Sequence, residues 1–118
     1  YHRARGEGHR TRFVSRERAY HGVNIGGVSL SGMVRNRETF TSVMPNVVAM
    51  RHTWTPDELF VRGQREAGAE TANDLARFCE TYGGSTIAAV FVEPVAGSTG
   101  TLGFFTVSPL DNLLGVDA

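Results

Sequence analysis

The sequence predicts an α/β fold, part of a mostly parallel sheet with flanking helices, on three observations. Strand-forming segments occur at residues 11–17, 45–53 and 86–94, and an amphipathic helical segment at 68–82 separates the last two. The third strand segment holds an unbroken apolar run from Ile87 to Val92, typical of a strand covered on both faces of a parallel sheet. Strands that alternate with helices indicate α/β architecture.

The composition fits one globular domain or a piece of a larger one: 118 residues, 41% hydrophobic and 20% charged. Twelve basic and twelve acidic side chains cancel, so no overall field favours nucleic acid or a membrane as partner. The basic residues cluster near the start of the chain, with aromatic residues sparse among them, and we interpret them as a solvated face. They are Arg3, Arg5, Arg10, Arg12, Arg16, Arg18 and Arg35.

Cysteine usage and hydropathy predict a cytoplasmic protein. Cys79 is the only cysteine, and no metal-ligand spacing of the CxxC kind occurs, so we expect neither an internal disulfide nor a metal site. No apolar run approaches membrane-spanning length, and the first residues lack a signal-peptide pattern. Because the chain does not begin with methionine, we expect it to be a fragment.

The first half of the chain alternates strand and turn signals. Phe13 and Val14 lie in the first strand segment, and Pro45 bounds the second. Between them, the glycine- and serine-rich residues 22–34 fit either a tightly packed short helix or a loop. We expect residues 54–66 to form a polar loop.

The clearest helix is predicted for residues 68–82. Its apolar stripe has spacings of three and four and consists of Ala72, Leu75, Phe78, Cys79 and Tyr82. The remaining positions, expected on the polar side, are Glu70, Asn73, Asp74, Arg77 and Glu80. Gly83 and Gly84 are expected to end the helix. Because Cys79 lies on the stripe, we interpret it as a core thiol rather than a nucleophile.

Polar groups follow two of the predicted strands at their carboxyl ends. Glu93 ends the third strand, and Tyr20, His21 and Gly22 follow the first. Ligands of open parallel sheets gather in the crevice outside these ends, so we weigh a ligand site against satisfied structural turns. Gly26, Gly27 and Gly32 do not form a GxGxxG nucleotide loop, and close packing is the better interpretation.

Three motifs occur along the chain in the order RERAYHGVNIGGVSLSG, GAETANDLARF and STIAAVFVEPVAGSTG. Together they resemble the large domain of class III, fold type I aminotransferases, and most closely their ω-amino acid:pyruvate or β-alanine:pyruvate group. The resemblance covers residues 1–101, which it implies are the central part of the cofactor-binding domain.

The resemblance implies pyridoxal 5'-phosphate as cofactor and assigns four cofactor-binding residues. Tyr20 would stack on the pyridine ring, with His21 and Gly22 completing the triplet and Glu93 belonging to the polar network near the ring's edge. It also implies an amine or ω-amino acid donor, a keto acid acceptor such as pyruvate, and a homodimer or larger assembly. Ser98 stands where ornithine- and GABA-type relatives carry a second acid, which favours the ω-group.

Residues 102–118 depart from the family pattern. Asp111 and Asp117 are in the wrong context for the aspartate that pairs with the pyridine nitrogen. The chain contains no lysine, so it cannot supply the Schiff base, and we assign it no catalytic residue. We therefore expect a fragment of an aminotransferase that is inactive alone.

Two alternatives stay open. One is a stand-alone α/β binding or interaction domain, in which the apolar tail 104–114 covers a sheet edge. The other is a different enzyme that uses His21 or His52 as a base with Glu93. Flanking DNA that encodes the lysine segment would favour the fragment over both.

Overall fold

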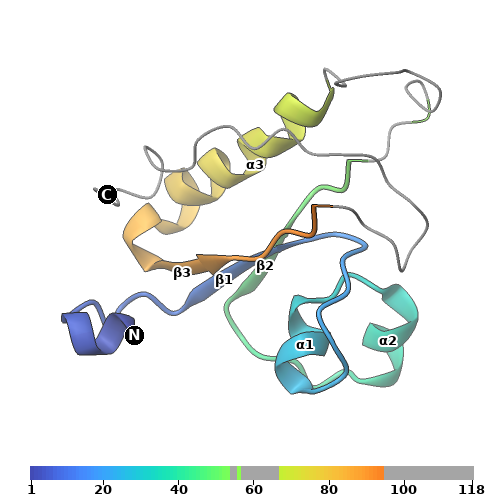
Figure 1. Cartoon of the computed structure of the whole chain (residues 1–118), viewed down its shortest axis with the longest axis horizontal. Helices are drawn as coiled ribbons and strands as arrows, with labels where there is room; N and C mark the ends of the chain where they lie inside the picture. Colours follow the sequence, from blue (N-terminus) through green and yellow to red (C-terminus); the bar gives the residue numbers. More distant parts are fainter. Residues whose placement is uncertain (54–55, 57–66, 95–118) are drawn as a thin grey trace.

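Three strands and three α-helices form the part of the chain that the computed structural model describes, residues 1–53, 56 and 67–94 (Figure 1). The elements are η1 (His2–Arg5), β1 (Arg12–Arg16), α1 (Ile25–Leu30), α2 (Val34–Thr39), β2 (Val47–Met50), α3 (Ala67–Tyr82), η3 (Gly84–Thr86) and β3 (Ile87–Val90). The predicted strands and long helix are confirmed, and the glycine-rich segment contains the short helix. The sequence pattern did not indicate α2, and the predicted polar loop lies outside the described residues apart from Pro56.

The sheet is parallel and has the order β2-β1-β3. Val14 at its centre pairs in register with Val48 of β2 and Val90 of β3. Figure 1 shows α3 on one side of the sheet and the α1–α2 pair on the other. The predicted α/β class is confirmed. Because neighbouring strands run parallel, the connections between them must cross over from one end of the sheet to the other.

The core lies between the sheet and α3. Its buried members are Val14, Met50, Leu75, Phe78 and Ile87, and Cys79 packs against them half-buried. The predicted helical stripe is therefore confirmed at Leu75 and Phe78, whereas Tyr82 at its end is 38% exposed. The helix ends at Tyr82 as expected, before Gly83 with φ +81°.

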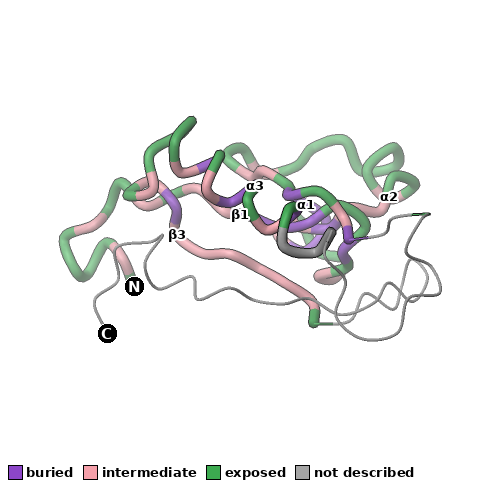
Figure 2. The backbone as a smooth tube through the Cα atoms, turned by 90° about the horizontal axis from the view of Figure 1, so that it is seen from above, coloured by how far each residue is buried: buried purple, intermediate pink, exposed green. Residues whose placement is uncertain are grey.

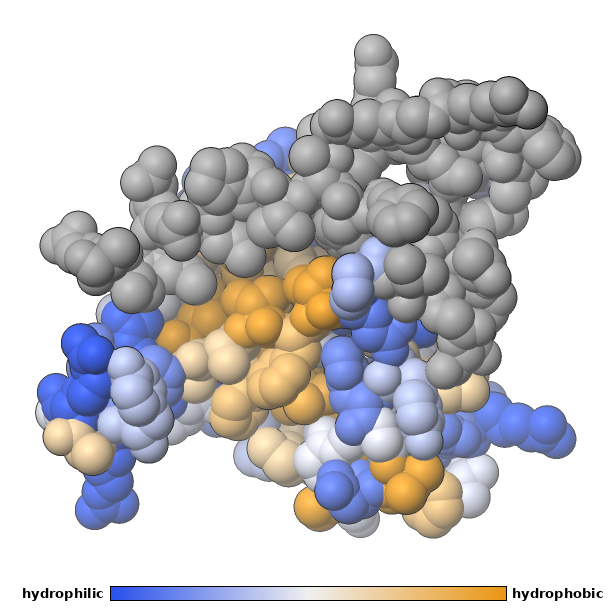
Figure 3. Space-filling model, viewed as in Figure 1, coloured by the Kyte–Doolittle hydropathy of each residue, from blue (hydrophilic) through white to orange (hydrophobic). Residues whose placement is uncertain are grey.

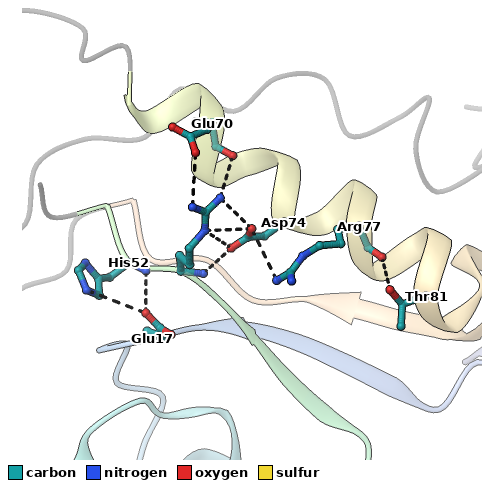
Figure 4. Close-up of polar contacts among 7 residues, drawn as sticks. Glu17, His52, Glu70, Asp74, Arg77 and Thr81 are labelled. Carbon is teal, nitrogen blue, oxygen red and sulfur yellow. Dashed lines mark hydrogen bonds and ion pairs between the residues drawn. The ribbon is translucent and has the colours of Figure 1, made fainter.

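Asp74 corrects the predicted polar side of α3, because its side chain is only 4% exposed. It accepts hydrogen bonds from the Arg51 backbone N–H at 2.8 Å and from Arg51 Nε at 3.0 and 3.1 Å (Figure 4). Arg51 follows β2, so this contact ties the helix to the end of that strand. Periodicity places a residue on a helix but does not reveal a partner that makes its burial favourable.

The third strand is less covered than its apolar run predicts. Only Ile87 is buried, and Ala88, Ala89 and Val90 are half-buried, as the tube in Figure 2 shows along β3. Within the described residues β3 is an edge strand, with α3 over one face. Figure 3 shows apolar surface between the polar N-terminal turn and the α1–α2 pair.

Replacing Asp74 tests the link between α3 and β2. Burial acts to raise the pKa of Asp74, but hydrogen bonds and charge from Arg51 outweigh it, so this pKa lies below its usual value. The ionised Asp74 carboxylate therefore stabilises the folded chain fully above its unfolded-state pKa of about 3.9. This stabilisation is lost as the pH falls through the lower folded-state pKa. We expect Asp74→Asn to lower the free energy of unfolding by about 1–2 kcal/mol at neutral pH.

Urea denaturation of both proteins between about pH 7 and pH 3 measures this, and the difference between them should shrink on acidification. Glu70→Gln is the control, because Glu70 also faces Arg51, at 3.5 Å, but its side chain is 74% exposed. A difference between Asp74→Asn and the unaltered chain that does not change with pH would contradict the assignment.

Candidate functional site

The predicted site residues meet where β1 and β3 end side by side. The Tyr20 backbone N–H donates a hydrogen bond to Glu93 Oε1 at 2.7 Å, across 73 positions of sequence. The structure thus brings Glu93 to the Tyr20-His21-Gly22 turn, as parallel neighbouring strands require of their carboxyl ends. An acid at the end of an apolar strand has a hydrogen-bond partner here, which accounts for its presence.

The Ser31 side chain holds the turn from the other side. The His21 N–H donates to Ser31 Oγ at 2.8 Å, and the Ser31 hydroxyl donates in turn to the Gly27 carbonyl at 2.7 Å. Ser31 is 1% exposed, so this chain of hydrogen bonds is shielded from water. Gly32 N–H donates to the Ala19 carbonyl at 2.9 Å and closes the same loop. Backbone groups on both sides of Tyr20 are therefore fixed.

The side chains of the turn have different environments. Tyr20 is 37% exposed. The His21 ring packs edge-on against Phe91, with centroids 5.9 Å apart, and its Nε2 is buried without a hydrogen bond among the described residues. Gly22 has φ +114°, a conformation that side-chain-bearing residues rarely adopt.

Close packing of α1 explains the glycines. A Cβ at Gly27 would lie 2.7 Å from both the Gly22 carbonyl carbon and the His21 carbonyl oxygen, and one at Gly32 would overlap the Arg18 backbone nitrogen. The interpretation as close-packing positions is confirmed at Gly27 and Gly32, whereas a Cβ at Gly26 would meet only ordinary contacts. Gly27 allows α1 to touch the backbone of the turn, and Gly32, just after the helix, allows a close approach to Glu17 and Arg18.

Arg16 corrects the solvated interpretation of the arginine cluster. Four of its members are exposed, Arg3, Arg5, Arg18 and Arg35, but Arg16 is only 2% exposed. Its Nη2 donates to the Glu93 backbone carbonyl at 3.1 Å. Burial lowers the pKa of Arg16 from its usual value, and the Glu93 carboxylate acts in the opposite direction. The strand pattern held a signal for this burial, since Arg16 stands two residues after the core residue Val14.

Other candidate groups lie outside this turn. His52 lies beside Glu17, with its Nε2 4.0 Å from Glu17 Oε2 (Figure 4), at the ends of β2 and β1. Burial, followed by the charge of Glu80, raises the pKa of the Cys79 thiol, as a core position predicts. Ser98, Asp111 and Asp117 lie outside the described residues. Among those described, no cluster of His, Cys, Asp and Glu could hold a metal, and no helix could cross a membrane.

The fold and this site define an α/β protein of the kind that collects polar groups at the ends of parallel strands. The model of the family "Aminotransferase class-III" matches residues 1–109. The chain therefore belongs to the class III aminotransferases, a family of pyridoxal-phosphate-dependent transferases.

Known relatives confirm the resemblance to the ω-group. The chain is 50% identical over 103 residues to an omega-aminotransferase of Caulobacter vibrioides, with 86% of this chain and 24% of that protein covered. It is 43% identical over 103 residues to a beta-alanine–pyruvate aminotransferase of Pseudomonas aeruginosa, with 86% and 23% covered. The chain thus spans about a quarter of these relatives.

Solved structures agree with the fold. A PLP-bound amine transaminase from an uncultivated Pseudomonas species is similar with a TM-score of 0.78 and 30% identity, covering 94% of this chain and 24% of that one. The division of this chain at residue 101 stays a prediction, because residues 95–118 are not among those described.

Gly27→Ala and Gly26→Ala form a matched pair that tests how closely α1 must approach the turn. The Gly27 methyl would meet backbone of His21 and Gly22, whereas the nearest atom to a Gly26 methyl is Asn24 Oδ1 at 3.5 Å, an ordinary contact. We expect Gly27→Ala to lower the free energy of unfolding by about 1–3 kcal/mol. Gly26→Ala should be neutral or stabilising by up to about 1 kcal/mol through helix propensity.

Urea denaturation measures both effects, and the NMR shift of the His21 amide reports on the turn. Equal stability of the two variants would contradict the close approach.

Proposed function

We propose that this chain is part of a pyridoxal-phosphate-dependent transaminase and forms one wall of its cofactor site. The observation that carries the proposal is the hydrogen bond between Tyr20 N–H and Glu93 Oε1 in a chain of this family. It joins the two motifs to which the resemblance assigns cofactor contacts. The whole protein would move an amino group from an amine or ω-amino acid to a keto acid.

The described residues fit an aromatic, charged cofactor. Tyr20, which is 37% exposed as a residue, carries a flat aromatic ring, and its backbone is held on both sides by hydrogen bonds. The buried His21 Nε2, which has no hydrogen bond among the described residues, is a polar atom for which a bound group or another part of the whole protein would provide a partner. Glu93 and Arg16 place opposite charges beside the turn.

Each group has a role that its position permits. The cofactor, when bound, serves as an electron sink for the amino-group transfer. Tyr20 would orient the ring by stacking, and α1 with Ser31 would keep Tyr20 from shifting when substrate exchanges. Phe91 beside His21 would exclude water from that side. Because this chain has no lysine, the covalent attachment of the cofactor would come from elsewhere in the whole protein.

The substrate class is proposed from the relatives. The name of the Pseudomonas aeruginosa relative pairs beta-alanine with pyruvate, which we take as donor and acceptor. Ser98, in place of a second acid, is consistent with that group. By the same resemblance the whole protein would work as a homodimer or larger assembly.

A chimera tests the function with the missing parts supplied. In the beta-alanine–pyruvate aminotransferase of Pseudomonas aeruginosa, the segment aligned with residues 1–94 is replaced by those of this chain. We expect amino transfer from β-alanine to pyruvate to persist. In the chimera, Tyr20→Ala should weaken binding of pyridoxamine phosphate, which forms no covalent bond to the protein, roughly 5- to 30-fold, for a loss of about 1–2 kcal/mol.

Tyr20→Phe is the control, because it keeps the ring and should bind within about twofold of the unaltered chimera. Equilibrium dialysis gives the affinities, and thermal unfolding shows whether each protein is folded. A folded chimera that binds no pyridoxamine phosphate, or equal binding by Tyr20→Ala, would count against the proposal. The first of these outcomes would favour a stand-alone, non-catalytic domain.

A further inference from the structure

We propose that Arg16 is a positioning residue that holds the carboxyl end of β3, so that the Glu93 carboxylate reaches the Tyr20 backbone and sets the position of the Tyr20 ring. Its effect on cofactor affinity rests on the proposed function. Its effect on the geometry of the turn does not, since that follows from contacts within the described residues.

Glu93 lies beyond the regular pairing of the sheet. The backbone pairing of β3 with β1 reaches Phe91, whose N–H donates to the Val14 carbonyl at 2.8 Å. Two residues further on, hydrogen bonds hold both the backbone and the side chain of Glu93. Arg16 Nη2 donates to its backbone carbonyl at 3.1 Å, and the Tyr20 N–H donates to its carboxylate at 2.7 Å.

Both contacts come from one short stretch of chain. Arg16 is the last residue of β1, and Tyr20 follows four residues later. The Arg16 side chain, the backbone from 16 to 20, and Glu93 therefore form a closed ring of covalent and hydrogen bonds. Loss of the Arg16 contact opens this ring and leaves the strand end free to move away from Tyr20.

Burying an arginine at this position costs free energy unless its guanidinium is paired. Its register partner in β2 is the core residue Met50, and an apolar side chain would fill such a position without the cost of removing a charge from water. The guanidinium lies close enough to the Glu93 carboxylate for their charges to interact, and it can donate several hydrogen bonds from one rigid plane. Both properties suit the fixing of a strand end.

Hydrogen exchange at single amides tests the geometry in the full 118-residue chain. In Arg16→Met, the Tyr20 amide should exchange roughly 10- to 100-fold faster, because its charged acceptor is no longer held in place. The Gly32 amide, which donates to Ala19 in the same loop, should keep its rate. Arg16→Lys should restore part of the Tyr20 protection, because it keeps the charge.

Arg12→Met is the matched control on the same strand. The Arg12 guanidinium lies 3.9 Å from the Tyr82 ring centroid, at the opposite end of β1, so its loss should leave Tyr20 exchange unchanged. Equal acceleration of the Tyr20 and Gly32 amides in Arg16→Met would overturn the proposal, since it would indicate general destabilisation.

The chimera gives a second readout, in which the host protein supports variants that do not fold as the 118-residue chain. Arg16→Met should weaken binding of pyridoxamine phosphate about tenfold, corresponding to about 1.4 kcal/mol, with Arg16→Lys between it and the unaltered chimera. Unchanged affinity in both variants would overturn the proposal. If the unaltered chimera binds nothing, the proposed function fails, and amide exchange still decides the role of Arg16.

Discussion

The parallel pairing of β1 with β3 is the constraint on which the rest of the structure depends. It places the ends of two segments 73 positions apart in one corner, where Tyr20 and Glu93 meet. The same pairing aligns Val14 with Val90 and so forms the apolar face of the sheet against which α3 packs. Core and site are therefore two consequences of one register, because a slip by one residue would turn Val14 away from α3 and move Glu93 away from Tyr20.

Small residues translate that register into a fixed turn. A helix can pack directly against backbone only where it carries no side chain, as at Gly27. Gly32, just after the helix, allows a similar close approach to Arg18. Ser29 and Ser31, which are 0% and 1% exposed, supply the hydrogen bonds that the buried backbone then needs. Ser31 Oγ accepts a hydrogen bond from the His21 N–H, and Ser29 Oγ accepts one from the Met44 N–H, each at 2.8 Å. The short α1 thus packs tightly although glycine disfavours helix.

Sequence predicted the features that follow from local pattern. Periodicity located α3 and the strand signals located the strands, and both polar groups, Glu93 and the Tyr20 turn, were expected at carboxyl ends of strands. Their contact depends in addition on β1 and β3 being neighbours in the sheet, which no local pattern predicted. What it could not predict depended on partners distant in sequence: Arg51 pairs with the buried Asp74. Strand alternation held a signal for the burial of Arg16, but not for its hydrogen bond to the Glu93 carbonyl. The short α2 has no buried residue and hence no apolar stripe to reveal it.

Among the described residues, the buried charged groups Asp74 and Arg16 provide a kind of contact that the apolar core cannot provide. Apolar contacts between α3 and the sheet are non-directional and fix where layers lie, but not where a strand end points. Asp74 and Arg16 each join an element to the end of a strand through directional, charge-assisted hydrogen bonds. Both act at the carboxyl edge of the sheet, where the parallel strands end. Such contacts fix where the strand ends lie, and at Arg16 they do so beside the turn where Tyr20 and Glu93 meet. The hydrogen bonds also offset part of the cost of removing these charges from water.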